Sequence, residues 1–566
     1  MGIKHFFLWF STEFPQYISR FNKKSPPKEV SIDTLMLDLN GVIHNSAQKI
    51  YKYGNHSQPK SILRPKRNEI RDSPILQKAC YVDICSTVEE MIEFVKPKKR
   101  LILAIDGVAP LSKQNQQRQR RYRGAMEHPD AYANKEEFDP NCITPGTRFM
   151  DNLSRYIDWF LRKKINDRVF DKELEIIFSN EKVAGEGEHK LVNFIRKFGT
   201  EEETYCINAL DADLFMLSLA TQKKNFYLLR EDTYTQDIDY MYVNIGSGFR
   251  EDLIKNLLSW SEENDEKRLI CDFILICFLC GNDFLPNIPS INLIEKGLST
   301  IIDIYKREKK YLTKFDEVNN VMFDKENFGI FLQNLANCEE GFLNEKIKNK
   351  LLYIPDTILE RNVNEEDNSI NFENYRKDYY ETKHMNEVEK VCEDYLDGCQ
   401  WVLTYYVNGI SDWEFIYKHH YSPFATELCK YVKDYNFKKS RKTFPLTPFE
   451  QLLCVLPPSN SSFLPSPLNT LYTTELKQFC PTEFKINYEG KKKKWEGVVE
   501  LPVVDFEYVK KIYREKEKLI DKKEIHRNIR GKNFRYSFDD SEFCQEFKSF
   551  YGDIRNCRVM TEAIDF

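Results

Sequence analysis

Seven acidic residues of this sequence follow apolar runs, at or near the points where those runs end. Asp38 closes the run Leu-Met-Leu-Asp, and Asp106 closes the run Leu-Ile-Leu-Ala-Ile-Asp. The other acids come after three further apolar stretches: Glu186, Glu188, Asp211, Asp213 and Asp283. Clustered carboxylate oxygens, without histidine or thiolate partners, suit Mg²⁺ or Mn²⁺. Two such ions would stabilise the attacking and leaving oxygens of a phosphodiester displacement.

These carboxylates repel one another if they share a crevice. Two unit charges 5 Å apart repel by about 3 kcal/mol at an effective dielectric constant near 20. The group therefore either takes up protons or holds cations. A single aspartate at a strand end is usually a turn or helix-cap residue. Six carboxylates at four predicted strand ends are harder to explain as caps, and they favour a metal site.

A basic helix is predicted directly after Asp106, within residues 107–126. Four polar residues recur there at i, i+4, i+7 and i+8, which places them on one helical face: Lys113, Gln117, Arg120 and Arg121. One ammonium, one amide and two guanidinium groups together suit a terminal phosphate, because arginine offers forked donors. The alternatives are a solvated basic helix and a helix that holds a nucleic-acid backbone without specificity.

The elements that must position these side chains form an α/β pattern. Residues 34–44, 100–110, 174–180 and 203–217 each read as a buried strand that leads into a loop, and helical patterns lie between them. This alternation predicts a mainly parallel central sheet flanked by helices. In open sheets of this kind the site lies at the carboxyl ends of the strands, which is where the acids fall.

The composition is that of a globular protein with a net charge of only −5, 41% hydrophobic and 30% charged residues. This charge argues against a uniformly basic nucleic-acid coat but not against a local basic channel. No apolar run approaches the roughly 18 residues of a membrane span, so no membrane association is expected. The 15 cysteines show no disulfide framework, which fits a reducing compartment. We expect the cytoplasm, with the nucleus as the open alternative.

Several stretches resemble, in the same order, the XRN family of 5′→3′ exoribonucleases. They are MGIKHFF, LDLNGVIHN, AIDGVAPLSKQNQQRQRRYR, AGEGEHK, LDADLFML, CGNDFLPNIP, QWVLTYYVNGISDWEFIYKHHYSPF, TPFEQLLCVLPP and FKINYEGKKKKWEGVVELP. The resemblance covers nearly the whole chain but only the catalytic core of the large family members, without their long C-terminal extension. It implies a PIN/FEN-like nuclease core with a second, aromatic-rich region packed against it.

The resemblance also implies a division of the chain and a role for each candidate residue. Residues 1–335 correspond to the nuclease domain, 336–390 to a connector and 391–566 to the second region, which completes the active-site pocket. The seven acids fall on the family's metal ligands, with Mg²⁺ or Mn²⁺ expected and two ions implied. The four residues of the basic helix fall on its 5′-phosphate pocket.

Base stacking in the family uses a histidine and a tryptophan. The histidine falls on His44 and the tryptophan on Trp413, with Phe415 as the other candidate aromatic. The alternative roles are structural for His44 and core packing for Trp413. Base–aromatic stacking contributes roughly 1–3 kcal/mol per base and tolerates any base, which suits a processive nuclease.

The function implied by the resemblance is processive 5′→3′ hydrolysis of single-stranded RNA that carries a 5′-monophosphate. Nucleoside 5′-monophosphates would be released by two-metal-ion hydrolysis during RNA decay, and decapping or RNA-decay proteins are the expected partners. Two alternatives belong to other classes: a structure-specific 5′ nuclease that acts on DNA flaps, and a catalytically silent RNA-binding module.

Overall fold

The structure is a computed structural model that describes most of the chain. The described residues are 2–3, 5–22, 30–56, 73–127, 138–208, 210–231, 239–261, 263–291, 297–438, 441–541 and 544–566. Residues 57–72 are the longest stretch that lies outside them. Within the described part, no helix is both long and apolar enough to cross a membrane.

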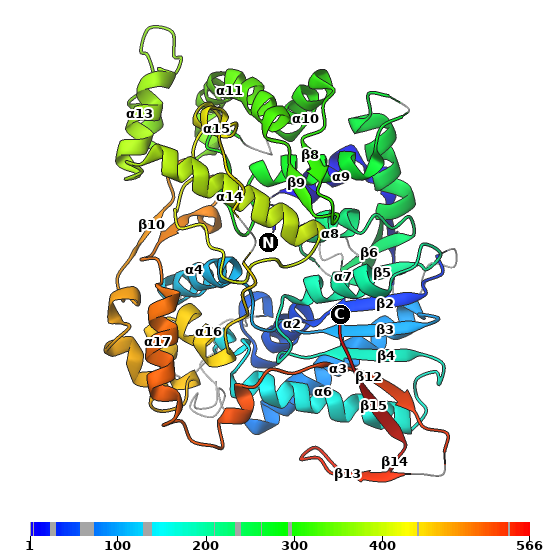
Figure 1. The fold of residues 1–566 in the computed structure, drawn as a ribbon. Helices are drawn as coiled ribbons and strands as arrows, with labels where there is room; N and C mark the ends of the chain where they lie inside the picture. Colours follow the sequence, from blue (N-terminus) through cyan, green and yellow to red (C-terminus); the bar gives the residue numbers. More distant parts are fainter. Residues whose placement is uncertain are drawn as a thin grey trace.

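A nine-stranded sheet forms the centre of the described structure (Figure 1). Its strand order is β1-β7-β6-β5-β2-β3-β4-β12-β15. The bounds are β1 (Ile18–Phe21), β2 (Thr34–Asp38), β3 (Arg100–Ala104), β4 (Glu175–Ser179), β5 (Tyr205–Asn208), β6 (Phe226–Glu231), β7 (Tyr240–Asn244), β12 (Asn533–Phe538) and β15 (Val559–Ile564). The four predicted strands are thus confirmed as β2, β3, β4 and β5.

The middle of the sheet is parallel, as predicted. β2 pairs in parallel with β3 and β5, β3 pairs with β4, and β5 pairs with β6. The chain reverses its direction of strand addition at β2, which lies between β3 and β5. Such a switch point opens a crevice at the carboxyl ends of the strands. The antiparallel strands β1, β7, β12 and β15 lie at the two edges.

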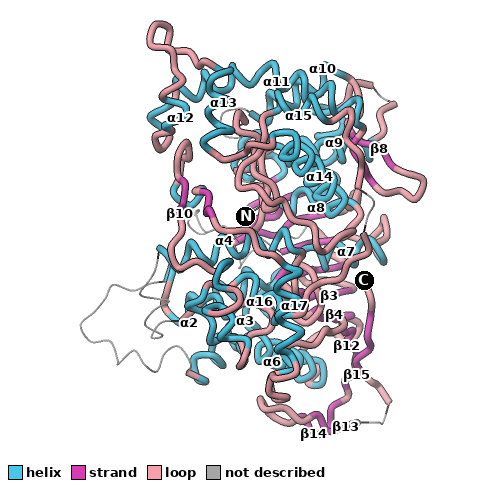
Figure 2. Tube along the Cα trace, turned by 60° about the vertical axis from the view of Figure 1, so that its left-hand side comes forward, coloured by secondary structure: helices cyan, strands magenta, loops and turns pink. Residues whose placement is uncertain are grey.

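Helices cover both faces of the sheet (Figures 1 and 2). Because successive side chains of a strand point to opposite faces, Leu35 and Leu37 of β2 enter one core and Met36 enters the other. The first core contains α2 (Leu39–Tyr51), α3 (Pro74–Val95) and α6 (Arg148–Asn166). The second contains α1 (Phe6–Glu13), α7 (Gly187–Phe198), α8 (Asp213–Ala220), α9 (Glu266–Leu279) and α14 (Val388–Val407).

The second region packs against the sheet, as the resemblance implied. Helix α14 belongs to the core of one face, and β12 and β15 extend the sheet beside β4. Helices α16 (Pro448–Val455) and α17 (Phe506–Glu517) form a third core with the start of α4 (Leu111–Glu127). Figure 1 shows α4 between α14 on one side and α16 and α17 on the other.

The segment expected as a connector, 336–390, contains much regular structure. Helix α11 (Lys325–Lys348) enters it, and α12 (Thr357–Glu360) and α13 (Phe372–Thr382) follow. Side chains from α11, α12 and α13 share a small core with Phe424. The division of the chain at 335 and 390 stays a prediction. The remaining α-helices and strands are α10 (Gly297–Glu308), α15 (Ala425–Tyr431), β8 (Thr313–Phe315), β9 (Val321–Phe323), β10 (Lys485–Asn487), β11 (Val498–Glu500), β13 (Gln545–Phe547) and β14 (Ile554–Cys557).

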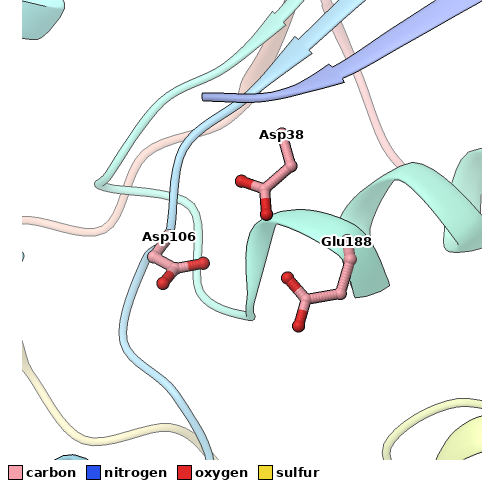
Figure 3. Close-up of side chains that lie close together, drawn as sticks. All are labelled: Asp38, Asp106 and Glu188. Carbon is pink, nitrogen blue, oxygen red and sulfur yellow. The ribbon is translucent and has the colours of Figure 1, made fainter. Parts of the chain in front are cut away.

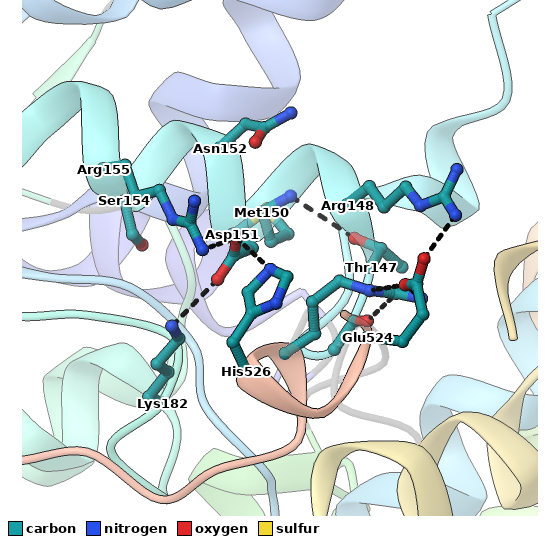
Figure 4. A network of polar contacts seen from close by, with 12 residues as sticks. Thr147, Arg148, Met150, Asp151, Asn152, Ser154, Arg155, Lys182, Glu524 and His526 are labelled. Atoms are coloured by element: carbon teal, nitrogen blue, oxygen red, sulfur yellow. Dashed lines mark hydrogen bonds and ion pairs between the residues drawn. The ribbon is translucent and has the colours of Figure 1, made fainter. Parts of the chain in front are cut away.

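A polar network fastens the C-terminal part of the chain to α6 (Figure 4). The carboxylate of Asp151 on α6 is buried and pairs with Arg155 at 2.9 Å, Lys182 at 2.8 Å and His526 at 3.1 Å. Lys182 lies on the loop between β4 and α7, which ends at the predicted acid Glu186. The network therefore connects that loop, α6 and the segment that leads to β12.

Candidate active site

Three of the predicted acids form a compact cluster at the carboxyl edge of the sheet (Figure 3). Asp38 is the last residue of β2, Asp106 follows the end of β3, and Glu188 lies in the first turn of α7. Each offers a carboxylate oxygen within 4.8 Å of the others. Hard oxygen ligands at this spacing can hold a divalent cation.

Backbone groups orient two of these carboxylates. Asp38 caps α2 and accepts a hydrogen bond from the amide of Asn40 at 3.2 Å. Asp106 accepts one from the amide of Gly187 at 2.7 Å. A β-carbon on Gly187 would lie 2.5 Å from the nearer carboxylate oxygen of Asp38, so no other residue fits there without displacing Asp38. This contact explains the second glycine of the sequence Gly-Glu-Gly-Glu.

Three further acids surround Lys113 of α4. Its ammonium lies 2.5 Å from Glu186 Oε2 and 2.8 Å from Asp283 Oδ2, and all three side chains are buried. The amide of Gly2 donates to the other Asp283 oxygen at 3.0 Å. Asp213 packs against Gly2: a β-carbon added to Gly2 would lie 2.3 Å from Asp213 Oδ1.

Burial and mutual repulsion raise the pKa values of several of these acids. Burial, with the nearby charge of Asp106, raises the pKa of Asp38 to about 8. Burial also raises the pKa of Glu188 well above its usual value, with Glu186 and Asp38 adding to the effect. For Glu186, burial outweighs the opposing ammonium of Lys113, and the pKa is about 7. The crevice therefore disfavours bare carboxylates, which a bound cation would stabilise.

The predicted basic helix faces the acid cluster. Lys113, Gln117, Arg120 and Arg121 all line a cavity of about 340 Å³ that Asp38, Asp106, Glu188 and Asp211 also line. Arg121 donates to Gln117 at 3.2 Å and to Thr144 at 2.8 Å, which fixes its guanidinium group. Arg118 and Arg123 of the same helix instead donate to the backbone of the second region, at Pro502 and Trp495.

The two predicted stacking residues lie in different surroundings. His44 of α2 lines the same cavity, and burial, together with Arg120 and Arg121, lowers its pKa to about 3, so its ring is neutral. Trp413 is not among the described residues that line this cavity. Its backbone accepts a hydrogen bond from Leu111 and donates one to Thr443. Phe415 stacks on Trp401, with ring centroids 5.1 Å apart, and packs against the core.

The structure thus gathers the predicted acids in two groups. Asp38, Asp106, Glu188 and Asp211 line the cavity, and Glu186, Asp213 and Asp283 lie around Lys113 or Gly2. Two tyrosines of α14 that contact these acids were not predicted from the sequence. Tyr405 donates to Glu186 at 2.9 Å, and Tyr406 donates to Asp213 at 3.4 Å. The only available signal was the adjacent Tyr-Tyr pair within a stretch already noted as similar to the XRN family.

A parallel sheet that presents clustered carboxylates opposite a basic helix defines a site suited to a divalent cation and a phosphate. The family model described as the XRN 5′-3′ exonuclease N-terminus matches residues 1–232. The model described as the Xrn1 helical domain matches residues 263–374 and 372–560. The chain belongs to the XRN family of 5′-3′ exonucleases.

Curated relatives match almost the whole chain. The 5′-3′ exoribonuclease 1 of Schizosaccharomyces pombe is 26% identical over 97% of the chain and 51% of its own length. The human 5′-3′ exoribonuclease 1 is 29% identical over 96% of the chain and 36% of its own length. The 5′-3′ exoribonuclease 2 homolog of Drosophila melanogaster is 26% identical over 97% of the chain and 74% of its own length. The chain thus spans about half, or less, of the length of these exoribonuclease 1 relatives.

Among solved structures, the catalytic core of Rad2 in complex with DNA matches at a TM-score of 0.31 and 11% identity. The match covers 59% of this chain and 73% of that one. This similarity is too weak to define either fold or function.

Proposed function

We propose that the protein is a processive 5′→3′ exoribonuclease that degrades single-stranded RNA with a 5′-monophosphate and releases nucleoside 5′-monophosphates. One observation carries the proposal: the Lys-Gln-Arg-Arg face of α4 and the acid cluster line the same cavity. A terminal phosphate bound to that face would lie beside the acids, so the first internal phosphodiester would be the bond cleaved. The exoribonuclease names of the relatives support this substrate class.

The residues of the cavity have distinct roles in this proposal. Lys113, Gln117, Arg120 and Arg121 bind the terminal phosphate through charge-assisted hydrogen bonds. The neutral ring of His44 stacks on the first base, and Trp413 is the proposed partner for a later base. The seven acids would hold two Mg²⁺ or Mn²⁺ ions. When bound, the ions supply an activated water and stabilise the charge that develops on the leaving oxygen.

The test compares two labelled RNAs of one sequence, one 5′-phosphorylated and one with a 5′-hydroxyl, each incubated with Mg²⁺. We expect mononucleotides from the first RNA alone and no products after chelation of the metal. Asp211→Ala should abolish turnover while RNA binding remains measurable. The double variant Arg120→Ala with Arg121→Ala should erase the preference for the phosphorylated end.

Two other results would replace the proposal. Internal cleavage of DNA flaps, with equal use of both 5′ ends, would identify a structure-specific nuclease. RNA binding without hydrolysis under any divalent ion would identify a silent binding module. Normal digestion by the Asp211→Ala variant would contradict the role of the acids.

The proposed substrate suggests a place of action. Removal of a cap exposes a 5′-monophosphate, so decapping and RNA-decay proteins are the proposed partners, and the cytoplasm is the proposed location. A fluorescent fusion of the full chain that accumulated in the nucleus would contradict the location.

A further inference from the structure

Lys113 occupies the position between two carboxylates where a second cation would be expected. Its ammonium lies 2.5 Å from Glu186 and 2.8 Å from Asp283, and the side chains of these three residues are 10%, 2% and 6% exposed. The remaining carboxylate oxygens are also engaged, by Tyr405 at 2.9 Å and by the amide of Gly2 at 3.0 Å. Each of the four oxygens of the Glu186 and Asp283 carboxylates therefore contacts a group of this chain.

The cluster of Asp38, Asp106 and Glu188 is arranged differently. In the described part of the chain, the ion pairs of Lys113 are with Glu186 and Asp283 and not with these three residues. Their carboxylate oxygens converge within 4.8 Å. The two groups of acids thus differ: Asp38, Asp106 and Glu188 line the cavity, whereas Glu186 and Asp283 already hold a positive charge.

A divalent cation placed between Glu186 and Asp283 would lie beside the ammonium of Lys113 and would be repelled by it. Lys113 must therefore move before Glu186 and Asp283 can bind a metal ion. Lysine can do so, because its ammonium sits on a flexible four-carbon stem. The ammonium has another place to bind within the same cavity. Lys113 lines this cavity together with Gln117, Arg120 and Arg121, the residues to which we assign the 5′-phosphate.

We propose that Lys113 couples binding of the 5′-phosphate to binding of the second cation. Without a phosphate, its ammonium holds Glu186 and Asp283, and the protein binds one divalent ion at Asp38, Asp106 and Glu188. A terminal phosphate draws the ammonium toward Gln117 and Arg120 and frees the two carboxylates for a second ion. This inference rests on the proposed function, and it gives a 5′-phosphate two effects: it anchors the strand and completes the metal centre.

Thermodynamic linkage makes the coupling reciprocal. A 5′-phosphorylated strand should tighten the second Mn²⁺ site about 5- to 150-fold, the usual range for coupled sites, and Mn²⁺ should tighten the strand by the same factor. The same strand with a 5′-hydroxyl should do neither.

The test counts Mn²⁺ ions by calorimetry and detects paired ions by electron paramagnetic resonance. The ligand is a 5′-phosphorylated oligonucleotide whose first linkage resists hydrolysis. We expect one tight ion in the protein alone, two spin-coupled ions with the phosphorylated ligand, and one with its 5′-hydroxyl form. Lys113→Met removes the charge and should bind two ions without any ligand.

Two variants serve as controls. Lys113→Arg keeps the charge and should bind one ion, and it remains informative if Lys113→Met fails to fold. Lys346→Met removes a lysine that pairs with Asp356 at 3.5 Å outside this cavity, and it should bind ions as the unmodified protein does.

Two equally tight ions in the unmodified protein without ligand would overturn the inference, as would a single ion in folded Lys113→Met. These readouts do not depend on turnover. Failure of the proposed function would instead appear as absent mononucleotide release, whatever the ion count.

Discussion

Gly187 brings the start of α7 so close to Asp38 that only a hydrogen atom fits between them. We predict that Gly187→Ala displaces the Asp38 carboxylate and lowers turnover strongly, because a metal ligand moved by a fraction of an ångström loses its geometry. Measurement of mononucleotide release and of Mn²⁺ affinity would check this. Gly341→Ala is the control, because its β-carbon would meet no atom within 4 Å and activity should not change.

Tyr405 orients Glu186 from the second region, across a long separation in sequence. We predict that Tyr405→Phe keeps the fold but weakens the site, since a hydrogen bond to a charged group contributes about 1.5–3 kcal/mol. Turnover at saturating RNA should fall, while KM for RNA changes little. Tyr472→Phe, which removes a hydroxyl that donates to Leu452, is the control. Equal loss of activity in both variants would contradict the role of Tyr405.

The raised pKa of Asp38 makes cation binding depend on pH. Its folded pKa of about 8 lies above the usual value, so Asp38 is protonated below that pH and must lose a proton when a metal ion binds. We predict that Mn²⁺ affinity rises as the pH increases toward about 8 and is lost as the pH falls. Calorimetry in two buffers of different ionisation enthalpy would count the protons released. A pH-independent affinity would contradict this assignment.

At the residue scale, sequence reasoning found the acids and the basic face but not their pairing. Strand ends and helical periodicity predict where the backbone of each residue lies, and they placed Asp38, Asp106 and Glu188 at one edge of the sheet. They do not predict that the ammonium of Lys113 contacts Glu186 and Asp283, because a long side chain can take several directions from one helical position. Tyr405 escaped notice for a similar reason, since an aromatic residue on a buried helix usually signals core packing.

At the scale of elements, the network around Asp151 connects α6, the loop before α7 and the segment before β12 (Figure 4). We predict that Asp151→Ala lowers the free energy of unfolding by about 1–3 kcal/mol, because it leaves the largely buried ammonium of Lys182 without its acceptor. The melting temperature should fall by roughly 1–2.5 °C. Glu173→Ala is the control, because Glu173 and its partner Lys172 are both largely exposed.

Asp151→Ala should also lower activity at the candidate active site, since Lys182 lies on the loop that leads to Glu186 and Glu188. A melting temperature unchanged by Asp151→Ala would show that the network contributes nothing to stability. The elements of this neighbourhood were predictable in part: α6 and β4 follow from their hydrophobic patterns. The link between them was not, because it depends on His526 and Lys182 meeting one aspartate from distant parts of the chain.

At the scale of the whole molecule, the alternation of strands and helices predicted the parallel middle of the sheet, because buried parallel strands are continuous apolar runs. The edge strands were not predicted. β12 contains Arg535 between Phe534 and Tyr536, and it resembles a mixed surface segment until it pairs with β4. The second region was expected to complete a pocket, which stays a prediction, and its strands β12 and β15 extend the sheet beside β4.

That shared sheet sets an order of events during synthesis. Phe534 pairs with Phe178, so the outer edge of β4 stays unpaired during synthesis until the chain has been made as far as β12. An uncovered strand edge is a template for wrong pairing, and the nascent protein must be shielded there in the meantime. The loop that ends at Glu186 follows β4 directly and leads into α7, which carries Glu188, so the surroundings of the cation-binding centre are complete only after β12 has been synthesised.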